Sequence, residues 1–186
     1  SSRTPPERSQ NTTIDNSSLG TAGSLYLSIG MDLKACPLCL YQRTFLMGAA
    51  AVLATGMFTK ARCSSLLAVL ALSAAIGGFG VAVFHVFLEL SDKLECPPGI
   101  IGLGTAPQQS LAVFAVLLAP LATSVVRGRN AGEFGSLAIF AASALGVAFS
   151  VATVVSAPPM PASPTEPYSQ PLEQCRPPYH LQTSSP

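Results

Sequence analysis

Long runs of apolar residues dominate the chain and alternate with short polar stretches. Four of these runs have the length of membrane-spanning helices, since about 20 predominantly apolar residues cross the ~30 Å hydrocarbon core of a bilayer. Glycine, alanine and serine recur within them, which favours close packing between neighbouring helices. The pattern predicts an all-α integral membrane protein, a bundle of four strong transmembrane helices. The predicted helices cover about residues 41–58, 65–90, 110–126 (with a kink at Pro120) and 134–156.

The segments that flank these runs differ in character. Residues 1–19 are polar and rich in Ser, Thr, Asn and Pro, which predicts a disordered N-terminus. Residues 20–33 are moderately apolar, but a helix of that length would be only about 21 Å long. They predict a short or truncated N-terminal helix, which would begin a transmembrane domain over residues 20–156. The proline-rich residues 157–186 predict an extended extracytoplasmic tail.

Composition and charge agree with a membrane protein and set its orientation. Hydrophobic residues make up 49% of the 186 residues and charged residues only 10%, whereas soluble domains carry about 25% charged residues. The net charge of +1 gives no reason to expect a nucleic acid as a partner. The loop after the first run holds Lys60 and Arg62, and the loop after the third holds Arg127 and Arg129. The positive-inside rule places both basic loops in the cytoplasm.

Five cysteines divide unevenly across this topology. Cys63 falls in a cytoplasmic loop, where it is expected to be inert or a site of reversible lipidation. Because the topology rests on lysine and arginine alone, the sorting of the other cysteines supports it independently. Four fall on the outer side, where disulfides form and persist: Cys36, Cys39, Cys96 and Cys175.

Cys36 and Cys39 form a C-x-x-C motif immediately before the first strong run. Two intervening residues permit an easily exchanged disulfide, and a helix N-terminus favours the thiolate over the thiol. Both properties suit electron transfer better than structural bracing. The alternative is half a zinc site, which needs two further ligands nearby. The sequence has no second C-x-x-C, so no metal is predicted.

Two ionisable residues accompany the motif. Arg43 follows Cys39 by four residues and shares its helix face; it either reaches the lipid head groups or stabilises a thiolate or a quinone carbonyl. His85 lies near the outer end of the second run. An ionisable residue inside a span indicates a function, and the alternative is a neutral imidazole bonded to a neighbouring helix. Glu89 is a candidate partner of His85 on the same face.

Cys96 and Cys175 remain as a second outer pair. Cys96 lies in the outer loop after the second run, and Cys175 lies on the proline-rich tail. The topology therefore favours their pairing. The pair either takes part in redox exchange or forms a static disulfide that holds the tail.

Residues 33–43, LKACPLCLYQR, resemble the signature of the disulfide bond formation protein B family. That family has a C-x-x-C, a following aromatic residue and an arginine at this spacing. His85, followed by Leu88, Leu90 and the loop residue Cys96, resembles the stretch that closes the family's third helix. The resemblance covers roughly residues 24–126.

The resemblance implies a thiol:quinone oxidoreductase of the bacterial inner membrane whose redox cysteines face the periplasm. Cys36 and Cys39 would be the quinone-facing pair, and Cys96 would belong to the pair that exchanges with a soluble thioredoxin-fold thiol oxidase. Arg43, and less directly His85, would lie near the quinone, either ubiquinone or menaquinone. Electrons would run from the partner through Cys96–Cys175 and then Cys36–Cys39 to the quinone. The chain is expected to be a monomer.

The sequence departs from the family pattern in two places. The family has a full spanning helix before its C-x-x-C, where this chain has a polar segment, and it usually keeps both loop cysteines between its last two helices. Here Cys175 lies beyond an additional helix at 134–156. Two other functions remain open: a reductase of the vitamin K epoxide reductase type, and a non-catalytic membrane protein whose disulfides brace external loops.

Overall fold

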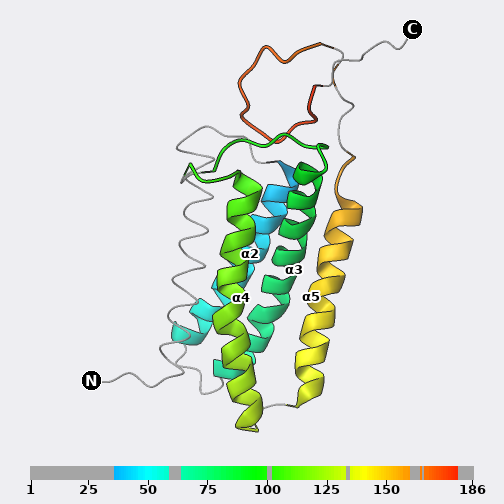
Figure 1. The fold of residues 1–186 in the computed structure, drawn as a ribbon. Helices are drawn as coiled ribbons and strands as arrows, with labels where there is room; N and C mark the ends of the chain where they lie inside the picture. Colours follow the sequence, from blue (N-terminus) through cyan, green and yellow to red (C-terminus); the bar gives the residue numbers. More distant parts are fainter. Residues whose placement is uncertain are drawn as a thin grey trace.

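Helices account for most of the chain that the structure describes. In this computed structural model, that part comprises residues 36–58, 64–99, 102–132, 135–159, 164 and 166–179. It contains helices and no strands within those ranges, which confirms the predicted all-α class. The helices are α2 (Pro37–Phe58), α3 (Ser64–Leu90), α4 (Ala106–Asn130) and α5 (Ser136–Ser156), as Figure 1 shows.

The helix bounds differ modestly from those expected. Helix α2 begins four residues before the predicted 41–58, so that Cys39 lies in its first turn. Helix α4 is longer at both ends than the predicted 110–126 and continues through Pro120. The segments predicted at 1–19 and 20–33 lie outside the described residues, as does Cys63.

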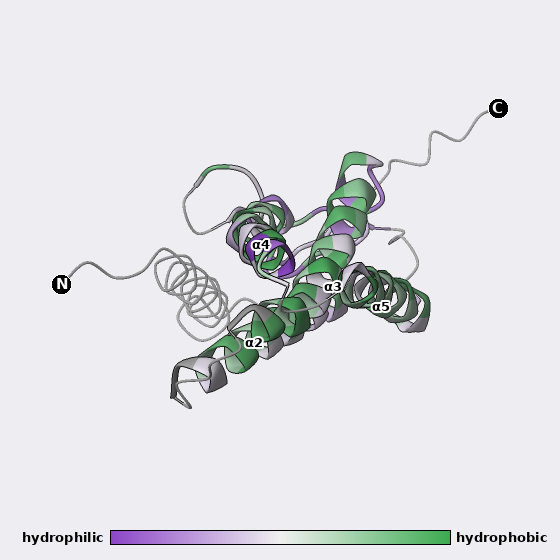
Figure 2. Cartoon of the chain, turned by 90° about the horizontal axis from the view of Figure 1, so that it is seen from below, coloured by the Kyte–Doolittle hydropathy of each residue, from purple (hydrophilic) through white to green (hydrophobic). Residues whose placement is uncertain are grey.

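Helix α3 is the centre of the bundle. It packs against α2, α4 and α5, and Figure 2 shows it between the other three when the bundle is viewed along the helices. The main core lies between α2, α3 and α4, where Leu53, Phe114 and Leu117 are almost completely buried. This position gives α3 one face toward the C-x-x-C helix and another toward α5.

Small residues bring the backbones of α3 and α5 together. A Cβ added at Gly146 of α5 would lie 2.7 Å from the backbone oxygen of Ser73 on α3, closer than Cβ atoms approach. A Cβ at Gly78 of α3 would likewise overlap the ring of Phe114 on α4. Close backbone approach through small residues is how helices associate in lipid, where the hydrophobic effect does not drive them together.

The outer surface of the bundle is apolar. Helix α5 exposes Leu137, Phe140 and Val155 by more than two thirds of their surface, an arrangement that would be unfavourable in water and is favourable against lipid. Each of the four helices is long and apolar enough to cross a membrane. The four predicted spans are thereby confirmed.

The described segments that carry cysteines gather at one end of the bundle. The start of α2, the end of α3, the start of α4 and the end of α5 all lie at the top of Figure 1. The tail runs back across this end, and a backbone bridge joins Arg176 to Glu95 of the α3–α4 loop. Arg127 and Arg129 lie in the last turn of α4, at the opposite end.

Candidate redox site

The C-x-x-C motif opens helix α2. Cys36 immediately precedes the helix, and Pro37 occupies its first position, where a missing N–H costs nothing. The Sγ atoms of Cys36 and Cys39 are 2.8 Å apart, and both residues are free of disulfides. The backbone N–H of Cys39 also points at the Cys36 sulfur, at 3.3 Å. The helix N-terminus thus directs donors at Cys36.

Cys36 is a thiolate at neutral pH because of these donors. The hydrogen bond from Cys39 is the largest influence and lowers the pKa of Cys36. Burial of Cys36 opposes it, while the hydrogen bond with His85, the electrostatic influence of that ring and the backbone N–H of Cys39 lower the pKa further. The pKa of Cys36 is about 5. A thiolate rather than a thiol is the nucleophile in disulfide exchange.

Cys96 and Cys175 are joined by a disulfide across 79 residues of sequence. The backbone N–H of Glu95 donates to the carbonyl oxygen of Arg176 at 2.8 Å, and the reciprocal bond is 3.0 Å long. These two bonds hold the loop and the tail side by side at the disulfide. Cys96 is buried, with 7% of its surface exposed, whereas Cys175 is partly exposed.

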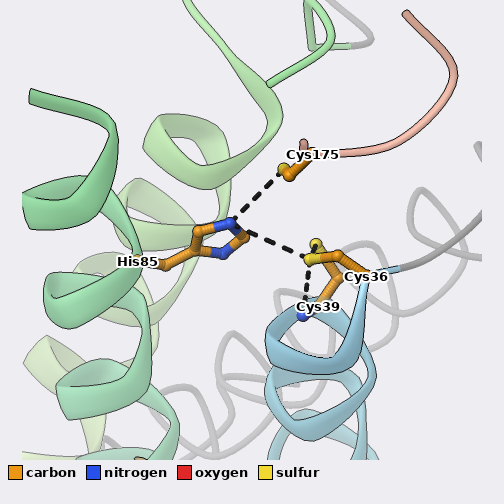
Figure 3. A group of neighbouring side chains, drawn as sticks. All are labelled: Cys36, Cys39, His85 and Cys175. Carbon is orange, nitrogen blue, oxygen red and sulfur yellow. Dashed lines mark hydrogen bonds between the residues drawn. The ribbon is translucent and has the colours of Figure 1, made fainter. Parts of the chain in front are cut away.

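His85 lies close to sulfur atoms of both cysteine pairs. Its side chain is fully buried, and Nε2 lies 3.4 Å from the sulfur of Cys175, 3.6 Å from that of Cys96 and 3.8 Å from that of Cys36. Figure 3 shows the His85 ring, which projects from α3 toward the start of α2 and the tail. The site is therefore assembled from three segments that are distant in the sequence.

Gln42 holds the other side of the His85 ring. Its side-chain nitrogen lies 3.3 Å from Nδ1 of His85, and its side-chain oxygen accepts a 2.6 Å hydrogen bond from Ser110 of α4. Because the amide nitrogen donates, Nδ1 is the acceptor, and the proton of the neutral ring is on Nε2, facing the sulfurs. His85 is thus positioned to donate a hydrogen bond to a thiolate.

Sequence reasoning gave Gln42 and Ser110 no role. The available signal was a glutamine one turn after the C-x-x-C on an otherwise apolar helix, since polar residues inside spans are expensive and are kept for a purpose. The interpretation of Glu89 as the partner of His85 was wrong. Glu89 instead accepts a 2.8 Å hydrogen bond from the hydroxyl of Thr105, at the start of α4.

Arg43 lies on α2, one turn below Cys39, and is partly buried. Its positive charge acts on Cys39. This agrees with the shared helix face that the spacing of the two residues predicts. Arg43 is therefore close enough to the C-x-x-C pair for its charge to act on Cys39.

A zinc site needs two ligands besides the C-x-x-C, which the sequence did not indicate, and the fold supplies them. Sulfur atoms of Cys36, Cys39 and Cys175 and a ring nitrogen of His85 all lie within 4.8 Å of one another. Cys175 is part of the disulfide, so it is not a thiolate ligand in this state. Three thiolates and an imidazole nevertheless form a donor set that suits zinc.

The family model for disulfide bond formation protein DsbB matches residues 16–115, just over half of the chain. The chain belongs to the DsbB family. It is accordingly a multi-pass membrane protein of a bacterial family, and disulfide bond formation by a disulfide oxidoreductase is the activity that this membership carries.

Individual relatives agree with the family model. Disulfide bond formation protein B of Burkholderia thailandensis is 29% identical over 141 residues, which cover 59% of this chain and 83% of that protein. A protein of Chlamydia trachomatis serovar D named "Probable disulfide formation protein" is 30% identical over 111 residues, covering 54% of this chain and 80% of that protein. Disulfide bond formation protein B of Burkholderia pseudomallei is 36% identical over 77 residues, 45% of its length. No solved structure matches the chain.

The DsbB match contains most of the site but not all of it. Cys36, Cys39, His85 and Cys96 lie inside residues 16–115, whereas Cys175 lies well beyond them. Helix α5 also follows the matched region. The fold, rather than the match, brings the distant Cys175 back to Cys96.

Proposed function

We propose that this DsbB-family chain oxidises the dithiol of an extracytoplasmic thioredoxin-fold partner. The two electrons pass through Cys96–Cys175 and then Cys36–Cys39 to a membrane quinone, either ubiquinone or menaquinone. The observation that carries the proposal is the gathering of three sulfurs from the two cysteine pairs, those of Cys175, Cys96 and Cys36, at 3.4 to 3.8 Å from one imidazole nitrogen. Thiol–disulfide exchange needs sulfurs that can meet, and these can.

The exchange balances in four steps. A partner thiolate attacks the Cys96–Cys175 disulfide, forming a mixed disulfide and releasing one of the two cysteines as a thiolate. That thiolate attacks the oxidised Cys36–Cys39 pair, and one cysteine of this pair leaves as a thiolate. The second partner thiol then completes its own disulfide, and the freed cysteine restores Cys96–Cys175. The partner has lost two electrons, and Cys36 and Cys39 have gained them as a dithiol.

The described state corresponds to the end of this sequence, with Cys96–Cys175 bonded and Cys36 and Cys39 free. His85 would act at each exchange by donating from Nε2 to whichever thiolate leaves. Both ring nitrogens of His85 are engaged, one with sulfur and one with Gln42. We therefore assign His85 to the sulfurs rather than to the quinone.

Arg43 is the residue that fits a quinone. The quinone accepts two electrons and two protons from the Cys36–Cys39 dithiol, and negative charge develops on its oxygens. Arg43 lies beside Cys39, and a guanidinium donates charge-assisted hydrogen bonds to such an oxygen. The apolar outer surface of the bundle is open to the lipid in which a quinone dissolves.

The proposed orientation places the cysteines in the periplasm. The site lies at the opposite end of the bundle from Arg127 and Arg129. Basic residues mark the cytoplasmic end of spanning helices. A soluble partner in the periplasm would then meet the loop and tail that carry Cys96 and Cys175.

The test is quinone reduction by the purified chain. The protein in detergent is mixed with a reduced thioredoxin-fold substrate and a ubiquinone or menaquinone analogue, in the presence of a chelator, and quinone absorbance is followed. Cys36→Ser and Cys175→Ser are the variants, and Cys63→Ser is the matched control because it makes the same change at a cysteine without a proposed role. We expect turnover in the wild type and the control, and none in the two variants.

Other outcomes would redirect the proposal. No quinone reduction by a folded wild type with either analogue would refute it. If Cys36→Ser abolished turnover while Cys175→Ser did not, Cys96–Cys175 would be a brace for the tail, as the flanking backbone bonds between Glu95 and Arg176 also permit. Reduction of substrate disulfides by a reduced quinone would favour the reductase direction.

A further inference from the structure

Four atoms that can bind a metal lie close together at the redox site, although the proposed function assigns their residues to thiol–disulfide exchange. The sulfurs of Cys36, Cys39 and Cys175 and a ring nitrogen of His85 lie within 4.8 Å of one another. They come from the start of α2, the last turns of α3 and the tail, as Figure 3 shows. Cys96 is bonded to Cys175 and is not one of the four.

The distances are close to those of a tetrahedral zinc site. Zinc binds cysteine sulfur at about 2.3 Å and histidine nitrogen at about 2.0–2.1 Å, which puts sulfur and nitrogen ligands about 3.5 Å apart and two sulfurs about 3.8 Å apart. Nε2 of His85 is 3.4 Å from Cys175 and 3.8 Å from Cys36. The sulfurs of Cys36 and Cys39, 2.8 Å apart, would have to separate by about 1 Å, which side-chain rotation can provide.

We propose that the fully reduced chain binds one Zn²⁺ through Cys36, Cys39, Cys175 and His85, and that the Cys96–Cys175 disulfide prevents this binding. A dithiol reductant or the reduced partner supplies two electrons to that disulfide and is itself oxidised. Zinc then takes the three cysteines as thiolates, and any protons still on their sulfurs are released to solvent. The metal is bound without any change in its oxidation state.

The surroundings of His85 can adapt to a metal. A zinc-bound Nε2 carries no proton, so Nδ1 must carry it and needs an acceptor. Turning over the Gln42 amide presents its oxygen to Nδ1 and its nitrogen to the hydroxyl oxygen of Ser110, and every group in the network keeps a partner. Three thiolates and one Zn²⁺ leave a single negative charge, which Arg43 beside Cys39 offsets.

Zinc binding would hold the chain in its reduced state. Thiolates bound to zinc are withdrawn from disulfide exchange, so neither Cys36 nor Cys175 could attack another sulfur. The site would act as a redox-gated, reversible block of thiol oxidation. This inference goes beyond the proposed function and does not depend on the direction of electron flow.

The test measures zinc retention and not activity. The detergent-solubilised chain, oxidised or reduced with a phosphine, is incubated with ZnCl₂ and desalted, and bound zinc is measured by mass spectrometry. We expect about one zinc per reduced chain and at least tenfold less in the oxidised chain. Co²⁺ in place of zinc should give the absorption of a tetrahedral thiolate site in the reduced chain alone.

Two variants form a matched pair, since each removes the same disulfide and leaves one thiol. Cys96→Ser retains all four ligands and should bind zinc as tightly as the reduced wild type. Cys175→Ser loses one ligand and should bind at least tenfold more weakly. In the zinc-loaded wild type, Cys36 and Cys175 should be protected from a maleimide until a chelator is added.

The proposal is overturned if the reduced wild type retains no more zinc than the oxidised chain, a comparison that needs no variant. It is also overturned if Cys175→Ser retains as much zinc as Cys96→Ser. Because quinone reduction is assayed with a chelator present, failure of zinc binding leaves that test unaffected.

Discussion

The acidity of the Cys36 thiol offers a direct test of the site's geometry. With a pKa of about 5, Cys36 is about 90% thiolate at pH 6, whereas a cysteine at the ordinary pKa of about 8.5 is about 0.3% thiolate. The population of the nucleophile therefore rises about 300-fold. A less basic thiolate is intrinsically less reactive, by about 40-fold for this change in pKa. Because these two effects on the rate oppose each other, the pH of half-maximal reactivity measures the pKa of Cys36 more directly than any single rate does.

The assay is alkylation of the chain with Cys36 and Cys39 reduced and the Cys96–Cys175 disulfide intact. Iodoacetamide is applied in short pulses between about pH 3.5 and 9.5, and the modified Cys36 peptide is quantified by mass spectrometry. We expect half-maximal reactivity near pH 5, because the reactive form appears as the pH rises through the pKa.

The perturbation is Cys39→Ala, which removes the donor that lowers the pKa of Cys36 most. The midpoint should move upward, toward the ordinary value of about 8.5. Cys39→Ser is the matched control, since its hydroxyl can still donate to the Cys36 sulfur, and its midpoint should stay low. A midpoint above pH 8 in the reduced wild type, or identical profiles for the Ala and Ser variants, would refute the reasoning.

Three further predictions follow from the packing. Gln42→Leu leaves the buried His85 nitrogen and the Ser110 hydroxyl without their partner, and should cost about 1–3 kcal/mol of stability. The loss should be seen as a lower unfolding temperature and slower turnover. An unchanged unfolding temperature would contradict the proposed network. Gly146→Ala places a Cβ 2.7 Å from a backbone oxygen of α3 and should destabilise the bundle by about 1–3 kcal/mol in detergent unfolding. Gly48→Ala, with nothing within 4 Å of the new Cβ, should instead stabilise α2 by up to about 1 kcal/mol, and equal effects at the two glycines would count against the close α3–α5 contact. Arg43→Gln should raise the KM for quinone by about 10-fold or more through loss of a charge-assisted hydrogen bond, and a KM change for the thiol substrate alone would place Arg43 elsewhere.

The sequence by itself determined the class of the protein and the number of described spans. Hydrophobic length and the positions of lysine and arginine are local properties, and in a bilayer they decide which segments cross and in which direction. The C-x-x-C at a helix start is also local, so the lowered pKa of the Cys36 thiol could be anticipated from its position in the sequence. The predicted topology also paired Cys96 with Cys175, and a disulfide joins them in the structure.

Only the tertiary structure decided what meets at the site. The packing of α2, α4 and the tail around α3 places His85 beside the sulfurs and Glu89, one turn further along, beside Thr105. The path of the tail brings Cys175 back to Cys96, which precedes it by 79 residues in the sequence. Such contacts depend on how helices pack, and sequence spacing along one helix carries no information about the face that a neighbouring helix covers. The same contacts bring three cysteines and one histidine together, a juxtaposition that the sequence, with its single C-x-x-C, argued against.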